Sequence, residues 1–285
     1  MKGVGPPLVT PFTESGDIDE TALRGLVGWV ERRDVDFLVP CGSTSEAELM
    51  TAEERARVVD IVTEEASIPV VAGTGSPGLR ETMAATREAA QAGATAALVV
   101  TPFYYEHDQE TLLAYYRAVA DAASIPVYLY SVPPFTDVRL EPETVEQLAR
   151  HPNVAGIKDS SGDIGTFMSV VQRTASQDFD PIVGSASVFA PALDAGATGG
   201  IMALANLAPE ALTDIAEIHP DDPQRARERN AALVDLNRAV TSQYGIPGLK
   251  WAMRERGAPA GYSRSPHRSV DDAAKRRIDS LLEAV

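Results

Sequence analysis

Short apolar runs alternate with longer amphipathic runs along the first two-thirds of the chain. The apolar runs are rich in valine and isoleucine, and turn residues bound most of them, so they predict β-strands. Most are continuously apolar, which is typical of strands that helices cover on both faces. The predicted strands are 4–12, 36–42, 68–75, 96–102, 125–132, 154–160, 181–185 and 199–205.

The segments between these runs carry the periodicity of amphipathic helices, with apolar residues three and four positions apart. The clearest are 19–33, 51–65 and 78–93. The second begins with a capping box, in which Thr51 is the N-cap and Glu54 is the third helical residue. The third ends at Gly93, which is suited to the left-handed position after a helix.

Regular alternation of strands and helices predicts right-handed parallel crossovers, and eight such units predict an α/β fold, a (β/α)₈ TIM barrel. Internal echoes support a repeated unit, because "QAGATAALVV" (91–100) resembles "DAGATGGIMA" (194–203). Strand signals stop after residue 205, and residues 208–285 show helical patterns without an intervening linker. We therefore predict a barrel over 1–207 and a C-terminal helical extension, packed on the barrel, over 208–285.

Catalytic groups of such barrels gather at the carboxyl ends of the strands. In this chain those ends carry hydroxyls, phenols and one amine rather than histidine clusters. The candidates are Ser43, Thr44, Tyr104, Tyr130, Lys158 and Gly184. There is no His-Glu-x-x-His or Cys-x-x-Cys motif, so we expect no metal site.

Lys158 is one of only four lysines, and it follows the apolar run Val154–Ile157. An apolar pocket can lower the pKa of a lysine by several units, and the neutral amine can then attack a ketone to form a Schiff base. Tyr130, one strand away, is the best candidate for moving the protons that this chemistry needs. The alternative is that Lys158 reaches solvent or pairs with Asp159, although adjacent strand residues point to opposite faces.

The net charge of −16 argues against nucleic acid and anionic membranes as partners, because such an acidic surface repels both. Arginine supplies 21 of the 25 basic residues, and the combination of few lysines with many acids favours a protein adapted to high salt over an ordinary acidic bacterial enzyme. The chain lacks an apolar run of membrane-spanning length and an apolar signal-peptide core, so we expect a cytoplasmic location. The single cysteine, Cys41, is expected to be a small buried apolar residue.

Four motifs together resemble the pyruvate-dependent class I aldolase family that includes dihydrodipicolinate synthase, N-acetylneuraminate lyase and 2-keto-3-deoxygluconate aldolase. "GSTSE" (42–46) resembles the family's Gly-Thr-Thr-Gly-Glu, and "TPFYY" (101–105) resembles its Pro-Tyr-Tyr. "YSVP" (130–133) resembles Tyr-Asn-x-Pro, and "GIKDSSG" (156–162) matches the family's lysine motif. The resemblance covers most of the chain.

This resemblance implies that Lys158 forms a Schiff base with pyruvate or another 2-keto acid, with no other cofactor. It implies that Tyr130 shuttles protons, that Ser43 and Thr44 bind the pyruvate carboxylate, and that Tyr104 completes a relay, often in a neighbouring subunit. Backbone near Gly184 and Ile201 would line the pocket. Family members are usually tetrameric, so we expect a homotetramer that binds small molecules, a 2-keto acid and an aldehyde.

Two departures bear on the substrate. Dihydrodipicolinate synthases carry an arginine shortly after the strand-five proline, where this chain has Phe135, and an aromatic ring cannot hold a carboxylate as a guanidinium does. Ser45 also replaces the second glycine of the strand-two motif. Both changes favour an aldolase that cleaves a 2-keto-3-deoxy sugar acid, such as 2-keto-3-deoxygluconate, to pyruvate and an aldehyde.

Three alternatives stay open. The first is dihydrodipicolinate (4-hydroxy-tetrahydrodipicolinate) synthase, which condenses pyruvate with aspartate semialdehyde, with Arg139 as a possible replacement for the missing arginine. The second is a dehydratase of the same family that acts on another 2-keto acid. The third is a barrel that has become a binding or regulatory protein, which the presence of both Lys158 and Tyr130 disfavours.

Overall fold

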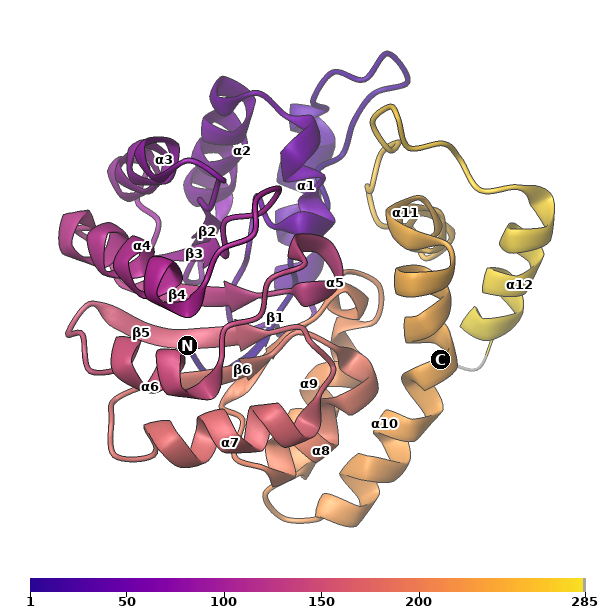
Figure 1. The fold of residues 1–285 in the computed structure, drawn as a ribbon. Coiled ribbons are helices and arrows are strands. Elements are labelled where there is room, and N and C mark those ends of the chain that lie inside the picture. Colours follow the sequence, from indigo (N-terminus) through magenta and orange to yellow (C-terminus); the bar gives the residue numbers. More distant parts are fainter. Residues whose placement is uncertain (284–285) are drawn as a thin grey trace.

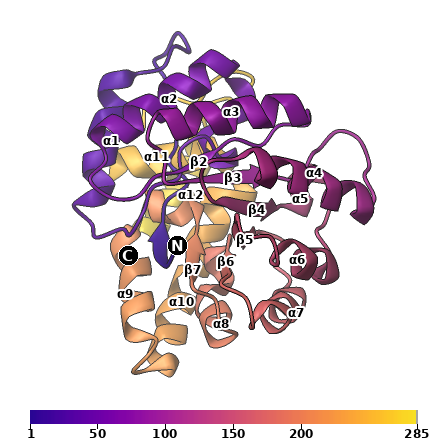
Figure 2. The ribbon, with the colours of Figure 1, turned by 90° about the vertical axis from the view of Figure 1, so that its left-hand side faces the viewer.

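The computed structural model describes residues 1–283, in which a curled parallel sheet is surrounded by helices (Figures 1 and 2). Seven strands of this part of the chain pair in the order β1-β7-β6-β5-β4-β3-β2, all parallel. The strands are β1 (Gly3–Gly5), β2 (Val71–Gly73), β3 (Ala96–Val100), β4 (Val127–Ser131), β5 (Val154–Asp159), β6 (Asp180–Val183) and β7 (Gly199–Ile201).

The gap between β1 and β2 is closed by residues 36–40. This segment, predicted as the second strand, makes only two parallel bridges, Pro7 with Val39 and Leu38 with Val70. Prolines explain why the ladder is interrupted, because proline has no N–H to donate. The carbonyls of Pro6, Pro40 and Pro69 still accept hydrogen bonds from Val39, Gly73 and Leu38. The predicted eightfold barrel is therefore confirmed, with one side held by isolated bridges rather than a regular strand.

Helices follow the strands and form the outer layer of the barrel (Figures 1 and 2). Their N-termini are well capped where the sequence predicts it: Thr51 Oγ1 accepts from the N–H of Glu54, and a Glu54 carboxylate oxygen accepts from the N–H of Thr51. Gly93 adopts a positive φ of 96° immediately after Ala92, the C-cap of α3. These helices are α1 (Glu20–Glu31), α2 (Ala52–Glu65), α3 (Leu79–Gln91), α4 (Gln109–Ala122), α5 (Pro133–Thr136), α6 (Pro142–Leu148), α7 (Ile164–Thr174) and α8 (Phe189–Asp194).

The chain after β7 is helical, as predicted. Its helices are α9 (Pro209–Ile218), α10 (Pro223–Arg238), α11 (Gly245–Glu255) and α12 (Asp272–Leu282), with a π-helical turn at Ala239–Gln243. Helix α9 packs against β1, α10 packs against α8 and α9, and α12 packs against α11 at one side of the barrel (Figure 1). The division of the chain into a barrel and an extension at residue 207 stays a prediction. The last two residues of the predicted extension, 284 and 285, lie outside the described part of the chain. Across residues 1–283, every helix is too short or too polar to cross a membrane.

The inside of the barrel is a layer of large side chains separate from the core under the helices. Its buried members come from alternate positions of neighbouring strands, as in other barrels of this type. They are Phe37, Val39, Val71, Ala96, Leu98, Tyr128, Tyr130, Val132, Ile182 and Ile201. This layer fills the barrel, so the barrel has no pore, and the carboxyl ends of the strands are where a site is expected.

Candidate active site

Lys158 and Tyr130 lie side by side at the carboxyl ends of β5 and β4. The two residues are register partners in adjacent parallel strands, so their side chains leave the same face of the sheet. The Lys158 Nζ atom lies 4.2 Å from the centroid of the Tyr130 ring. Both residues are buried, with 3% and 4% of their surfaces exposed. The predicted pairing of amine and phenol is therefore present in the structure.

Asp159 does not neutralise Lys158. Its carboxylate accepts a hydrogen bond of 2.7 Å from the N–H of Ser161, and burial raises the pKa of this carboxyl. Within residues 1–283, no side chain or carbonyl accepts a hydrogen bond from Lys158 Nζ, and no carboxylate lies within ion-pair distance of it. The alternative in which Lys158 pairs with Asp159 is therefore wrong.

The "GSTSE" motif forms a short 3-10 helix, Ser43–Ser45, beside Tyr130. The hydroxyl oxygens of Ser43 and Tyr130 are 3.4 Å apart, and Thr44 lines the same cavity. Ser45 has a different role, because its buried hydroxyl donates to the carbonyl of Leu8 and accepts from the N–H of Gly42. Our interpretation of Ser45 as a residue that bears on the substrate is therefore wrong, since it holds the loop and does not line the cavity.

A cavity of about 580 Å³ opens above Lys158 at the carboxyl ends of the strands. This volume lies within the ~300–1,000 Å³ usual for ligand sites and exceeds what a three-carbon acid fills. Gly184 lies at its wall, where an added Cβ atom would come within 2.8 Å of the Cβ of Ser160 and closer still to its hydroxyl, so a side chain at this position would force Ser160 to move. The structure brings these predicted residues to the cavity: Ser43, Thr44, Tyr130, Phe135, Lys158, Gly184 and Ile201.

Tyr104 is the exception among the predicted residues. It lies in the loop after β3 with a positive φ of 79°, and 87% of its surface is exposed. Its ring packs edge-on against Tyr105, with centroids 5.0 Å apart, and it does not line the cavity of its own chain. Tyr104 is therefore not part of the cavity of its own chain. A role in the site of a neighbouring subunit stays a prediction.

The C-terminal segment contributes a polar wall that the sequence did not reveal. Asn237 at the end of α10, Thr241 and Ser242 in the π-helical turn, and His267 in the loop before α12 all line the cavity. Single-turn π-helices often mark functional sites. These residues lie far beyond β7, so the rule that catalytic groups follow the strands could not predict them. The π-helical turn also has no recognisable sequence pattern.

A buried ion pair lies behind this wall. Lys250 on α11 contacts the carboxylate of Glu46, and both side chains are fully buried. Lys250 Nζ also donates 2.7 Å hydrogen bonds to the carbonyls of Thr10 and Tyr262. Burial lowers the pKa of Lys250, while the charge of Glu46 acts in the opposite direction. The other oxygen of Glu46 lies 3.0 Å from Nδ1 of His267.

The cavity holds few charges. Its lining residues include Lys158 and His267 but no arginine and no carboxylate. Arg139 does not replace the missing arginine, because its guanidinium donates to Asp163 and Thr166, at 2.9 and 3.0 Å.

In the described part of the chain, no group of three or more metal-ligating side chains comes together. Cys41 is buried, and burial raises the pKa of its thiol to about 12, as expected for a residue without a role in ionic chemistry.

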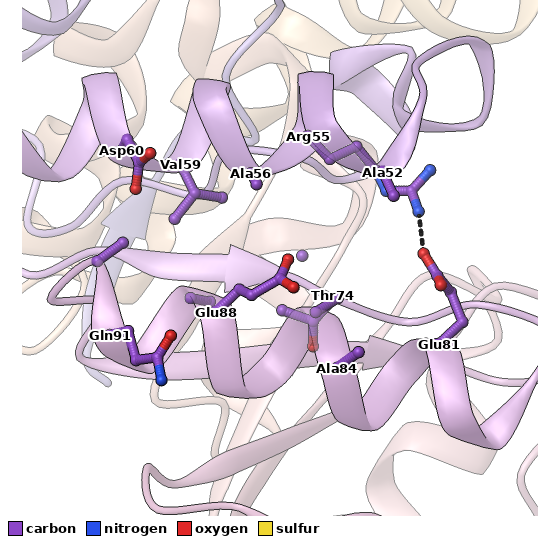
Figure 3. Close-up of a pocket in the computed structure, with 14 residues that line it drawn as sticks. Ala52, Arg55, Ala56, Val59, Asp60, Thr74, Glu81, Ala84, Glu88 and Gln91 are labelled. Carbon is purple, nitrogen blue, oxygen red and sulfur yellow. Dashed lines mark hydrogen bonds and ion pairs between the residues drawn. The ribbon is translucent and has the colours of Figure 1, made fainter.

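A second hollow, of about 340 Å³, lies between α2 and α3 on the outside of the barrel (Figure 3). Alanines and the Arg55–Glu81 ion pair, 2.8 Å long, line it. Thr74 reaches this hollow rather than the site, and its hydroxyl bonds to that of Thr86. The hollow shares no residue with the cavity above Lys158 and contains no comparable nucleophile, so the cavity is the candidate active site.

Comparisons with known proteins agree with this geometry. The model of the dihydrodipicolinate synthetase family matches residues 1–285. The 4-hydroxy-tetrahydrodipicolinate synthase of Methanothrix thermoacetophila is 36% identical over 283 residues, which cover 99% of this chain and 96% of the relative. An uncharacterized DapA-like lyase of Halobacterium salinarum is also 36% identical, over 99% of this chain and 93% of that protein.

The crystal structure of dihydrodipicolinate synthase from Acinetobacter baumannii, complexed with pyruvate, superimposes with a TM-score of 0.95 at 30% identity. It covers 99% of this chain, and the match covers 98% of that protein. Enzymes of this family bind pyruvate as a covalent Schiff base on a lysine and need no external cofactor. The chain belongs to the dihydrodipicolinate synthetase family of pyruvate-dependent class I aldolases.

Proposed function

We propose that Lys158 is the lysine of this protein that forms the Schiff base with pyruvate or a longer 2-keto acid. One observation carries the proposal: a buried amine without an ion-pair partner opens into the cavity beside a phenol. An amine held in an ion pair is protonated and has no lone pair for attack. Lys158 forms no such pair with any carboxylate of residues 1–283.

The reaction begins when the Lys158 nitrogen attacks the ketone carbon of the 2-keto acid. A proton reaches the former ketone oxygen, water leaves, and a protonated imine forms. In the cleavage direction, the hydroxyl at C4 loses its proton, the C3–C4 bond breaks, and the released aldehyde departs. The electron pair of that bond passes to the iminium as an enamine, which takes up a proton at C3, and water then frees pyruvate and the lysine.

Tyr130 supports these proton transfers, because its ring lies against Lys158 and its hydroxyl approaches that of Ser43. Ser43 and Thr44 supply hydroxyl groups at the same wall and suit the carboxylate of the 2-keto acid. Gly184 and Ile201 complete the pocket around the small pyruvate portion. Each of these roles is part of the proposal.

Borohydride reduction in the presence of pyruvate tests the nucleophile. Wild type and Lys275→Ala should both acquire a stable adduct. Lys275 is a partly exposed lysine on α12 that pairs with Asp272 and does not line the cavity. Lys158→Ala should acquire none. Equal labelling of Lys158→Ala and wild type contradicts the assignment.

For the second substrate, we propose that the enzyme cleaves a 2-keto-3-deoxy sugar acid such as 2-keto-3-deoxygluconate. The supporting observation is the uncharged character of the cavity wall away from Lys158. Phe135 lies at the mouth, 74% exposed, and Arg139 is engaged elsewhere. Hydroxyl and amide groups of Asn237, Thr241 and Ser242 suit a chain of hydroxyls better than a second carboxylate.

The second candidate is 4-hydroxy-tetrahydrodipicolinate synthase, which condenses pyruvate with aspartate semialdehyde. The names of relatives, including the one from Methanothrix thermoacetophila, support this reading rather than the sugar-acid reading. The equally similar DapA-like lyase of Halobacterium salinarum carries no assigned substrate and supports neither. A dehydratase on another 2-keto acid is the third possibility and differs by releasing no aldehyde.

A substrate panel separates the three. Pyruvate release and aldehyde formation from 2-keto-3-deoxygluconate support the aldolase, and more efficient condensation of aspartate semialdehyde with pyruvate supports the synthase. The variant Phe135→Arg sharpens the result, because an added guanidinium at the mouth should improve use of a carboxylate-bearing aldehyde. If the wild type already prefers aspartate semialdehyde, the sugar-acid assignment is wrong.

Three other expectations stay proposals. The family is typically tetrameric, and the two exposed tyrosines Tyr104 and Tyr105 would then lie at a contact between subunits. The cytoplasmic location and the adaptation to high salt rest on the sequence alone. Assays of the panel at low and high salt test the last of these.

A further inference from the structure

His267 stands at the mouth of the cavity, on the wall that the C-terminal segment supplies. Its side chain is 37% exposed, whereas Lys158 and Tyr130 are almost completely buried. A 2-keto acid attached to Lys158 therefore has its reacting carbons deep in the cavity. The part of the substrate that extends away from Lys158 then has to lie against the more exposed lining residues, and His267 is one of these.

Glu46 fixes the orientation of this imidazole. Its carboxylate lies 3.0 Å from Nδ1 of His267, accepts a 2.9 Å hydrogen bond from the N–H of Arg264, and contacts Lys250 through its other oxygen. The loop that carries His267 is itself anchored, because the Arg264 guanidinium donates to Glu54 and to the carbonyls of Leu49 and Gly16. The imidazole is thus held by a rigid frame.

The hydrogen bond to Glu46 assigns the two ring nitrogens. A carboxylate only accepts, so Nδ1 carries a proton, and Nε2 is the nitrogen left for a ligand. Within residues 1–283, Nε2 has no hydrogen-bond partner. A hydroxyl group fits Nε2 in either protonation state, because a hydroxyl donates to the neutral ring and accepts from the charged one.

We propose that His267 is a specificity-determining residue that binds a hydroxyl group on the distal, aldehyde-derived part of the 2-keto acid. This inference rests on the proposed function and adds a residue that none of the strand-end motifs includes. A hydroxyl is the favoured ligand because the neighbouring groups, from Asn237 and Thr241, are uncharged, and the cavity lacks the arginine that a distal carboxylate or phosphate calls for.

Two variants divide the roles of the two nitrogens. In His267→Asn, the side-chain amide takes the place of Nδ1, so the contact with Glu46 can persist while the group facing the cavity is lost. In His267→Gln, the longer amide reaches the place of Nε2, so the group facing the cavity persists while the contact with Glu46 is lost. Both variants are compared with wild type in borohydride trapping of pyruvate, in urea unfolding, and in cleavage kinetics.

The kinetics use two substrates that undergo the same bond cleavage. One is 2-keto-3-deoxygluconate, which has distal hydroxyls, and the other is 4-hydroxy-2-oxopentanoate, which has a methyl group there. We expect His267→Asn to raise KM for the first about 3- to 10-fold, the loss of one hydrogen bond, with little change in kcat. The second substrate and pyruvate trapping should be unaffected, and His267→Gln should recover much of the loss.

Other outcomes overturn the inference. An equal rise in KM for both substrates, or weaker trapping of pyruvate, places His267 at the carboxylate common to all substrates. Unchanged kinetics in His267→Asn removes any contact with substrate. A wild type that traps pyruvate but does not cleave 2-keto-3-deoxygluconate overturns this inference together with the sugar-acid assignment and leaves the Schiff base intact. A wild type that traps no pyruvate contradicts the proposed function itself.

Discussion

Two buried lysines of this protein differ in their hydrogen-bond and ion-pair partners. Lys158, at the end of β5, has an aromatic ring beside it, an open cavity before it, and no acceptor among the described residues. Lys250, on α11, donates to two carbonyls and to the carboxylate of Glu46 and has no exposed surface. One amine is left available, and the other is fully used as a structural cation.

The difference shows that burial alone does not identify a nucleophile. Both amines lose water on folding, but the hydrogen bonds that replace the water decide what each can do. Lys250, whose N–H groups all have acceptors, stabilises the packing of α11 against the loop that follows residues 36–40. Lys158 has no such partner among residues 1–283 and lines the cavity, which is why we propose it as the nucleophile.

Substitution of Lys158 should give the largest effect. Lys158→Ala removes the amine that we propose forms the imine, so turnover of any 2-keto acid should fall on the order of 10⁴-fold or more, as for other covalent catalysts. Stability should change little, because the side chain faces the cavity. A coupled assay of pyruvate release and a urea denaturation curve measure the two quantities. Substantial activity in this variant removes the contrast between the two lysines.

The next largest effect is expected from Tyr130→Phe. This variant keeps the ring that packs against Lys158 and removes the hydroxyl near Ser43. Loss of a general acid–base group typically costs about 10²- to 10⁴-fold. We expect kcat to fall within that range and the single-turnover rate of imine formation to fall with it. An unchanged rate would assign the proton transfers to another group.

For Lys250 the expected effect is on stability. Lys250→Met leaves the buried carboxylate of Glu46 without its main partner, and breaking a buried pair in this way typically costs ~3–5 kcal/mol. The folded fraction should still trap pyruvate on Lys158. Urea unfolding of this variant, with Lys2→Met as an exposed lysine control, measures the loss. Normal stability combined with failure to trap pyruvate would show that Lys250, too, takes part in the chemistry.

The smallest effect is expected on the pH dependence of the unfolding free energy, through the ion pair of Glu54 and Arg264. The Arg264 guanidinium lowers the pKa of Glu54 from its ordinary value of 4.5 to about 2. Because the folded-state pKa is depressed, the pair stabilises the protein fully above about pH 4.5 and loses this contribution as the pH falls towards 2. Glu54→Gln should therefore be less stable at neutral pH and show a shallower decline in unfolding free energy between those pH values.

Glu106→Gln provides the control for that experiment. Glu106 is an exposed carboxylate without an ion-pair partner in residues 1–283, so its substitution should leave the profile unchanged. An identical profile for Glu54→Gln and wild type would mean that the Arg264 pair does not anchor the loop that carries His267.

The sequence predicted the barrel and the pair of Lys158 and Tyr130 because both follow from local rules. Apolar runs of strand length mark the barrel, and parallel strands bring their last residues to one edge. The prediction was less accurate for residues 36–40, because the apolar pattern does not record that Pro6, Pro40 and Pro69 interrupt the ladder.

The rest of the site depends on contacts between distant segments. Glu46 and His267 are 221 positions apart, and Glu46 and Lys250 are 204 apart, so no periodicity along the chain connects them. Ser45 is an example of the opposite error. A difference from the family motif at that position suggested a role in substrate choice, whereas the hydroxyl only holds the loop to Leu8.

The most direct test of the contrast between the two lysines is to locate the pyruvate adduct. Wild-type protein is reduced with borohydride in the presence of pyruvate, digested, and mapped by mass spectrometry across its four lysines. We predict one modified site, in the peptide that contains Lys158, with the peptide of Lys250 unmodified. An adduct on Lys250, or equal modification of several lysines, would contradict the proposal that Lys158 of β5 is the nucleophile.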